Sequence, residues 1–149
     1  MVRLFKPSRR GEGSAAIEFG VAVPLLLTLL MGAVEVGYAM YEAMQVYNSV
    51  EAGMLYAAKH GFDATAIANA VVNATNTTGI TATPAPVQFC GCPSASGITT
   101  ISCSSTCTGN VTPGQYVRIS AALNHTTILP YPGLDLPTTL TAQSVLRLN

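Results

Sequence analysis

The feature that most constrains this chain is an apolar run close to its N-terminus. Residues 19–34 carry no charge and are bounded by Glu18 and Glu35. At a helical rise of about 1.5 Å per residue the run spans only ~24 Å, whereas the hydrocarbon core of a bilayer is ~30 Å thick. A helix that crosses a membrane here must therefore extend past one of the two carboxylates, either back to Ser14 or forward to Tyr41. For Glu35 we expect a position in the headgroup region on the far side.

The distribution of charge indicates the orientation of this helix. Four cations precede the run, at Arg3, Lys6, Arg9 and Arg10, and the positive-inside rule then places the N-terminus in the cytoplasm. Only 9% of the 149 residues are charged, compared with about 25% in ordinary soluble domains. So little charge favours membrane attachment or assembly. No basic patch follows the run, which argues against nucleic acid as a partner.

A cleaved secretory signal is an alternative explanation of the apolar run. Cleavage after Ala33 or Ala39 is conceivable, but neither position gives a clean A-x-A site, and the run contains Pro24. Apolar character also continues beyond Glu35. The sequence therefore favours a helix that stays attached to the downstream chain.

The helix is expected to continue to about Ala58 and to end at Gly61, after two basic residues. Apolar residues recur at three- and four-residue spacing and predict the face that packs on a domain, with Glu42 on another face. These residues are Met40, Met44, Tyr47, Val50, Met54 and Ala57. Asp63 can cap a second, shorter helix from Ala64 to about Ala74.

Strand patterns begin at Val87 and continue to the C-terminus. In the run QYVRISAALN, residues 117, 119, 121 and 123 are apolar and alternate with the others, which predicts one buried face. We expect three or four antiparallel strands packed on the second half of the long helix, an α+β fold. The expected organisation is a cytoplasmic leader (1–13), a transmembrane or assembly helix (14–41) and a periplasmic pilin-like α+β domain (42–149).

The cysteines lie close together in this second part of the chain, at Cys90, Cys92, Cys103 and Cys107. An even, clustered number beyond a membrane segment favours disulfides in an oxidising compartment. The spacings C-x-C and C-x3-C differ from the usual zinc-binding C-x2-C, and no histidine lies nearby, so a metal site is the weaker alternative. A bond between the first two is strained, so we expect cross-links from that pair to the other two.

The sharpest local pattern is Gly13-Ser14-Ala15-Ala16-Ile17-Glu18-Phe19. Cleavage after Gly13 would create an amine at Ser14, one helical turn from Glu18. That amine could neutralise the carboxylate, in the same or a neighbouring chain, where an unpaired charge is costly. Cleavage would also remove four cations and Glu12, which changes the net charge from 0 to 0 − 4 + 1 = −3.

In these residues the chain resembles the type IV prepilins, and within them the TadE-like pseudopilins of Tad (tight adherence, Flp-type) pilus systems. The resemblance lies in RRGEGSAAIEFGVAVPLLLTLLMGAVEVGYA, with Glu18, Phe19, Pro24 six residues past the glutamate, and the acidic–aromatic residues 35–38. Phe19 stands where the major Flp pilins carry tyrosine, and this chain is much longer than they are. Both departures favour a minor subunit.

The resemblance implies cleavage between Gly13 and Ser14 by a prepilin peptidase, with Glu18 used for processing or subunit registration. It implies other pilin-like subunits and the Tad assembly platform as partners, a bacterial inner-membrane location, and possible incorporation into an extracellular pilus. For Pro24 we expect a tolerated helix kink, or local melting when subunits pack. An uncleaved single-pass protein with a ligand- or partner-binding periplasmic domain is the alternative.

Residues for catalysis are sparse. The sequence has no G-x-S-x-G, no P-loop and no H-E-x-x-H, and we expect His60 and His125 to be surface or helix-cap residues. We therefore expect a non-enzymatic protein without a cofactor, a metal or a small-molecule substrate.

Overall fold

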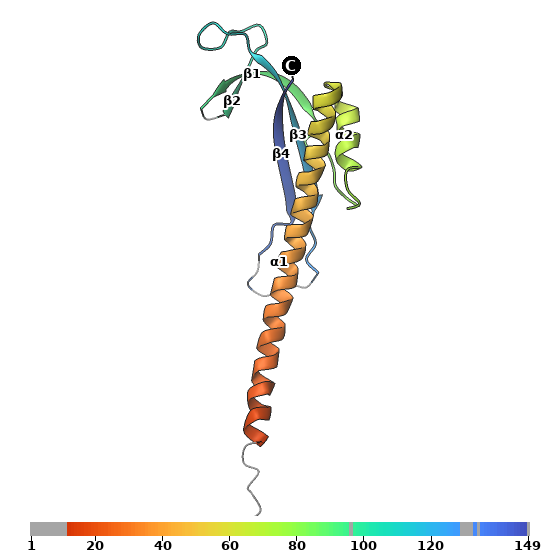
Figure 1. The fold of residues 1–149 in the computed structure, drawn as a ribbon, viewed down its shortest axis with the longest axis vertical. Coiled ribbons are helices and arrows are strands. Elements are labelled where there is room, and N and C mark those ends of the chain that lie inside the picture. The colour runs from red at the N-terminus through yellow and green to blue at the C-terminus, as the bar shows by residue number, and fades with distance from the viewer. Residues whose placement is uncertain (1–11, 96, 129–132, 134, 149) are drawn as a thin grey trace, which may run out of the picture.

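The first element of the structure is one long helix, α1 (Glu12–His60), of 49 residues. The structure is a computed structural model that describes residues 12–95, 97–128, 133 and 135–148. At 1.5 Å per residue α1 is about 73 Å long. Its N-terminal half stands alone, whereas the rest of the fold lies beside its C-terminal half (Figure 1). The expected continuous helix is confirmed.

The end of α1 and the start of α2 (Ala64–Val72) follow the signals in the sequence. Gly61 has φ +82°, a left-handed conformation that glycine adopts without strain, and its N–H donates to the carbonyl of Ala57 at 2.9 Å. The Asp63 carboxylate then accepts from the N–H of Ala66 at 2.9 Å. This N-cap fixes where the chain turns back along α1.

The remaining elements form one antiparallel sheet, which confirms the α+β class. Its strands are β1 (Val87–Ser94), β2 (Gly97–Ile101), β3 (Gly114–Asn124) and β4 (Thr139–Leu148). Their order is β2-β1-β3-β4, and β3 pairs with β4 along ten residue positions, from Gln115↔Leu148 to Asn124↔Thr139. The β1–β2 hairpin bends away from α1 at the end far from the N-terminus (Figure 1).

The core lies where α1, α2 and β3 meet. The predicted inward face of β3 is buried, as Val117 and Ile119 are fully inaccessible to solvent, and Ile67 and Val71 of α2 join them. Gly53 of α1 is a point of close approach, because a Cβ atom there would lie 2.6 Å from Val71 Cγ2. This glycine lets three elements pack together closely.

The expected packing stripe on α1 is wrong in its N-terminal part. Met40, Met44 and Tyr47 are exposed, whereas Val50 and Ala57 are buried as expected. The face that packs on the domain instead holds small and polar residues, namely Glu35, Ala39, Glu42, Val46, Ser49 and Gly53. The reason is steric: small side chains allow the sheet and the loops to approach the helix, and large side chains then face outward.

Two disulfides join β1 to the loop that follows β2. They are Cys90–Cys103 and Cys92–Cys107, so each bond runs from the first cysteine pair to the second, and no cysteine is free. Sequence spacing had left two such pairings open. The cross-links attach an uncharged loop to the end of the molecule that is farthest from the start of α1 (Figure 1).

Candidate functional site

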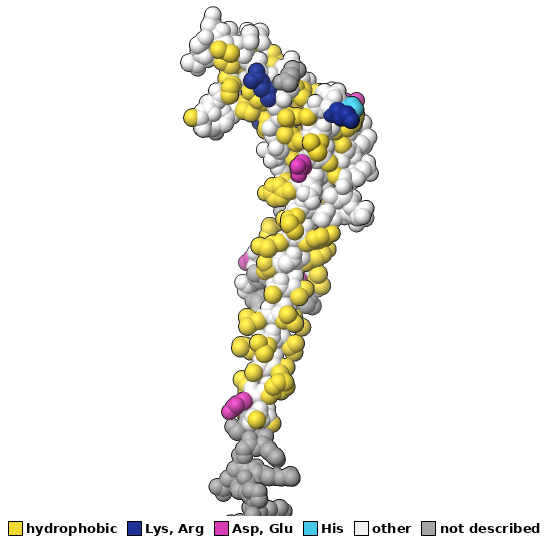
Figure 2. Space-filling model, in the orientation of Figure 1, with side chains coloured by type: hydrophobic (Ala, Val, Ile, Leu, Met, Phe, Trp, Pro, Cys, Tyr) yellow, Lys and Arg dark blue, Asp and Glu magenta, His cyan; other side chains and the backbone are white. Residues whose placement is uncertain are grey.

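The most unusual surface of the molecule is the N-terminal half of α1. Large apolar side chains there are exposed on all sides, with Phe19 at 71%, Leu26 at 61% and Leu30 at 60% of their surface. Figure 2 shows hydrophobic side chains along this whole length. By length and composition α1 can cross a membrane, and its most apolar window has no part buried within the fold.

The residues predicted to be processed lie at the start of this helix. Gly13 and Ser14 are in the first turn of α1, and Glu18 and Phe19 follow with exposed side chains. Residues 1–11 of the expected leader lie outside the described residues.

Pro24 lies inside α1, which continues through it. A proline at this position cannot donate to the carbonyl four residues earlier. The hydroxyl of Thr28 donates to the carbonyl of Pro24 at 2.6 Å, which adds a local hydrogen bond one turn further on. The backbone thus gives the Thr28 hydroxyl a hydrogen-bond partner, which a hydroxyl group needs where no water is present.

At the other end of the exposed segment, Glu35 is buried. Only 1% of its surface is accessible, and its Oε1 accepts a hydrogen bond from the N–H of Ile128 at 2.9 Å. Ile128 belongs to the connection between β3 and β4. The domain therefore covers this side chain and supplies a donor, while its expected position in the headgroup region stays a prediction.

Two turns further along α1, Glu42 and His125 form a second buried contact. The Glu42 Oε2 and His125 Nδ1 atoms are 2.6 Å apart, and the exposed fractions of the two residues are 8% and 4%. The Tyr38 ring lies beside the imidazole, with centroids 6.1 Å apart. His125 is therefore neither a surface nor a cap residue. Its Nε2 is buried and has no hydrogen-bond partner among the described residues.

Sequence reasoning missed this pair of helix-to-loop contacts. The available signal was that Glu35 and Glu42 are seven residues apart and so share one helix face with Ala39 and Val46. His125 also directly follows the alternating β3 pattern. Both carboxylates hydrogen-bond to residues that follow β3, and these contacts fix the position of the domain along the axis of α1.

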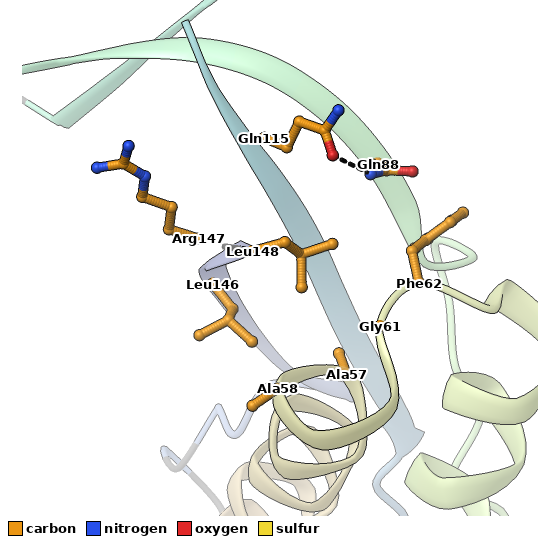
Figure 3. Close-up of a pocket in the computed structure, with 9 residues that line it drawn as sticks. All are labelled: Ala57, Ala58, Gly61, Phe62, Gln88, Gln115, Leu146, Arg147 and Leu148. Carbon is orange, nitrogen blue, oxygen red and sulfur yellow. Dashed lines mark hydrogen bonds between the residues drawn. The ribbon is translucent and has the colours of Figure 1, made fainter.

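A cavity of about 600 Å³ lies at the far end of the domain, between the end of α1 and the C-terminal part of β4 (Figure 3). On one side of it, Gln88 of β1 and Gln115 of β3 are joined by a hydrogen bond of 3.1 Å. Leu146 and Leu148 line it from β4. Among the described residues that line it, Arg147 is the only charged one. The described lining residues include no nucleophile–base pair.

The predicted site residues fall into two groups at opposite ends of the molecule. Gly13 to Pro24 lie at the start of α1, and the four cysteines lie at the distal hairpin (Figure 1). Within the part of the chain that the structure describes, no group of three His, Cys, Asp or Glu residues could hold a metal ion. The segment best suited to function is therefore α1 itself.

Comparison with known proteins agrees with this choice of segment. A family model described as TadE-like protein matches residues 13–54, which are nearly all of α1, from its first turn past the buried carboxylates. No curated protein and no solved structure matches the chain. The resemblance seen in the sequence is thus confirmed over this segment, in which the chain is similar to TadE-like proteins.

Proposed function

We propose that this chain is a pseudopilin, a minor pilin-like subunit that acts in the assembly of a Tad pilus. It inserts into the bacterial inner membrane with its N-terminus in the cytoplasm and its disulfide-bonded domain in the periplasm. A prepilin peptidase cuts between Gly13 and Ser14, and the shortened α1 then packs with other pilin-like subunits on the Tad assembly platform. Its role is structural rather than catalytic.

The observation that carries this proposal is the coincidence of three features in one segment. The family match begins at Gly13, the helix is already formed there, and the apolar residues that follow are exposed. Exposed apolar surface of this extent is unfavourable in water and needs lipid or other apolar helices around it. A helix of this kind can exchange a lipid environment for helix partners at little cost, since both are apolar.

The position of Glu18 is consistent with an exchange of lipid for helix partners after cleavage. Before cleavage the four cations of the leader hold the N-terminus at the cytoplasmic surface. Cleavage removes those cations and leaves an amine at Ser14, four residues before Glu18. The amine of one subunit and the carboxylate of the same or a neighbouring subunit can then neutralise each other inside an apolar assembly.

Co-expression with an active prepilin peptidase tests the proposal. We expect the chain to lose its first 13 residues and to begin at Ser14, as read by N-terminal sequencing and intact mass. Gly13→Leu should prevent the cut, because the peptidase must accommodate the residue before the scissile bond. Gly20→Leu is the matched control, since a side chain at Gly20 meets nothing within 4 Å, and it should be cut normally.

An intact N-terminus in the presence of active peptidase would contradict the proposal. It would favour the alternative of an uncleaved single-pass membrane protein whose periplasmic domain binds a partner or ligand, and the cavity near Arg147 would be the first place to look for that contact. Cleavage after Ala33 or Ala39 would instead identify a secretory signal.

A further inference from the structure

The face of the sheet that is turned away from α1 carries two of the three cations found beyond residue 10. Val117 and Ile119 of β3 are buried in the core that α1 shares, so Arg118 between them points to the opposite face. Arg147 pairs with Tyr116 of β3 and shares that face. Within the part of the chain that the structure describes, neither arginine has a carboxylate partner.

Arg118 is held in a defined position on this outer sheet face. Its guanidinium carbon lies 4.9 Å from the centre of the Phe89 ring, and that ring stacks on Tyr116 with centroids 5.7 Å apart. Val87 pairs directly with Arg118 and lies two residues from Phe89, so its side chain is on the same face. Val87 is 46% exposed. The outer sheet face therefore presents a cation beside an exposed aliphatic side chain.

The outer side of α1 presents the complementary pair of side chains. Glu51 is exposed, and Leu55, one turn further along the same side of the helix, is 66% exposed. Glu51 lines a hollow of about 420 Å³ together with Tyr47 and Met54, and it is the only charged residue among the described ones that line it. Its carboxylate has no cation partner among the described residues.

The two surfaces lie at the same level of the molecule. The long strands run alongside α1 (Figure 1), and a Cβ atom at Gly53 would lie 3.2 Å from Ile119 Cγ2, so these two residues share one level. Leu55 is two residues, about 3 Å, further toward the end of α1. Because β3 runs toward the Glu42 contact, Arg118 is also displaced toward the end of α1, by about 3.3 Å. Two copies standing upright in one membrane would therefore bring these surfaces level with each other.

We propose that the outer sheet face of one copy of this chain docks on the outer side of α1 in a second copy. Arg118 enters the hollow beside Glu51, and Val87 packs on Leu55. Charge complementarity identifies the occupant, because each surface holds an opposite charge that its own described chain leaves without a partner.

The contact joins two different surfaces, so each copy can bind one neighbour through its sheet and another through its helix. Such head-to-tail contacts build rings or open helical arrays. The inference deepens the proposed function by naming a further copy of this chain as a pilin-like partner. It rests on the membrane insertion of α1 contained in that function, since insertion sets the helices parallel and level.

Cysteine cross-linking in membranes tests the contact without removing either charge. All four native cysteines are in disulfides, so Leu55→Cys and Val87→Cys each introduce one free thiol. Two full-length copies with different epitope tags, one with each variant, are produced together in bacterial membranes and oxidised with copper phenanthroline. We expect a disulfide-linked dimer with both tags at about ten times the yield of either variant alone, because docking raises the local concentration of one thiol at the other.

Thr139→Cys is the matched control for Val87→Cys. Thr139 is exposed and lies six residues before Val145, which pairs with Arg118, so it is on the same sheet face but about 20 Å nearer the start of α1. It should link to Leu55→Cys no more than chance collision allows. Equal linking of positions 87 and 139, or no link at position 87, overturns the proposal.

Charge reversal tests whether the two charges select the partner. Glu51→Arg in the Leu55→Cys copy faces Arg118 of the other copy and should lower the yield of the link about tenfold, because like charges then meet in the interface. Arg118→Glu in the Val87→Cys copy should restore the yield. A yield that the first change leaves unaltered, or that the second does not restore, overturns the proposal.

The two proposals fail in distinguishable ways. A link between positions 55 and 87 in a chain that prepilin peptidase does not cut would keep the contact and reject the pseudopilin. A cut chain without this link would keep the pseudopilin and reject the contact.

Discussion

The two halves of α1 are both apolar, yet they are covered in opposite ways. In residues 15–34 the large side chains, such as Leu26, are exposed on every side. In residues 35–60 the face that packs is made of small or polar residues such as Ala39, Ser49 and Gly53, and large residues such as Met44 face outward. The first half depends on surroundings that the chain does not provide, whereas the second half depends on close contact with its own domain.

Apolar side chains therefore have different requirements in the two halves of the helix. Where a helix lies in lipid, any aliphatic side chain serves, because the surroundings are fluid and adapt to its shape. Where a helix packs on a sheet and a second helix, shape decides, because protein interiors are close-packed. Equivalent substitutions in the two halves should therefore have unequal effects on domain stability, and the following predictions test this.

The largest effect is expected from the buried contact at the junction of the two halves. Glu42→Leu removes the acceptor beside His125 Nδ1 and leaves an imidazole buried without either hydrogen bond. Breaking a buried pair on one side costs about 3–5 kcal/mol. Urea unfolding in detergent micelles, followed by the tyrosine circular dichroism of the domain, measures the loss.

Two further variants show whether the effect belongs to the pair. Glu51→Leu removes an exposed carboxylate from the same helix and should change stability by no more than about 0.5 kcal/mol. The double variant Glu42→Leu with His125→Leu should cost less than the sum of the two single variants, because the partner is no longer left unpaired. Additive costs would show that the two side chains do not interact.

A smaller but still large effect is expected from shortening a core side chain. Ile119→Ala in β3 removes a fully buried side chain from the face that packs on α1 and should destabilise the domain by about 2–5 kcal/mol. Leu26→Ala makes a comparable truncation in the exposed half, where the side chain is 61% accessible, so the same unfolding curve should not move. A domain that responds equally to both would mean that the halves of α1 are not independent.

The smallest effect, and one that should differ in sign, is expected from adding a methyl group. Gly53→Ala places a Cβ atom 2.6 Å from Val71 Cγ2 and 3.2 Å from Ile119 Cγ2, and such overpacking costs about 1–3 kcal/mol. Gly37→Ala meets nothing within 4 Å and should leave stability unchanged or raise it by up to about 1 kcal/mol, since alanine favours the helix. Thermal melting of both variants under identical conditions gives the comparison.

Much of the fold could be predicted from local signals. The continuous helix to His60, its end at Gly61, the Asp63 cap and the buried alternation of β3 are each written in a few neighbouring residues. Such signals depend on backbone conformation, which is local, and on periodicity, which a single strand or helix expresses by itself. The TadE-like pattern was readable for the same reason, because it lies within one helix.

The junction could not be predicted in this way. Glu35, Glu42 and His125 looked like solvent-facing residues because each is polar, and the helix around the first two is apolar on all sides. A helix that is apolar on all sides has no polar face, so the periodicity of its sequence does not indicate which side will be buried. Met40, Met44 and Tyr47 were placed on the packing face because large apolar residues recur there at helical spacing, and the structure turns them outward.

The sequence by itself determined that this chain has a long apolar helix whose uncharged run is bounded by Glu18 and Glu35, followed by a small α+β domain with clustered cysteines. Only the tertiary structure decided which helix face is buried, how the cysteines pair, and that the β3–β4 connection covers Glu35. The physical reason is separation along the chain. The partners at this junction, Glu42 with His125 and Glu35 with Ile128, are 83 and 93 residues apart, and no local pattern encodes which distant segment will pack beside a helix.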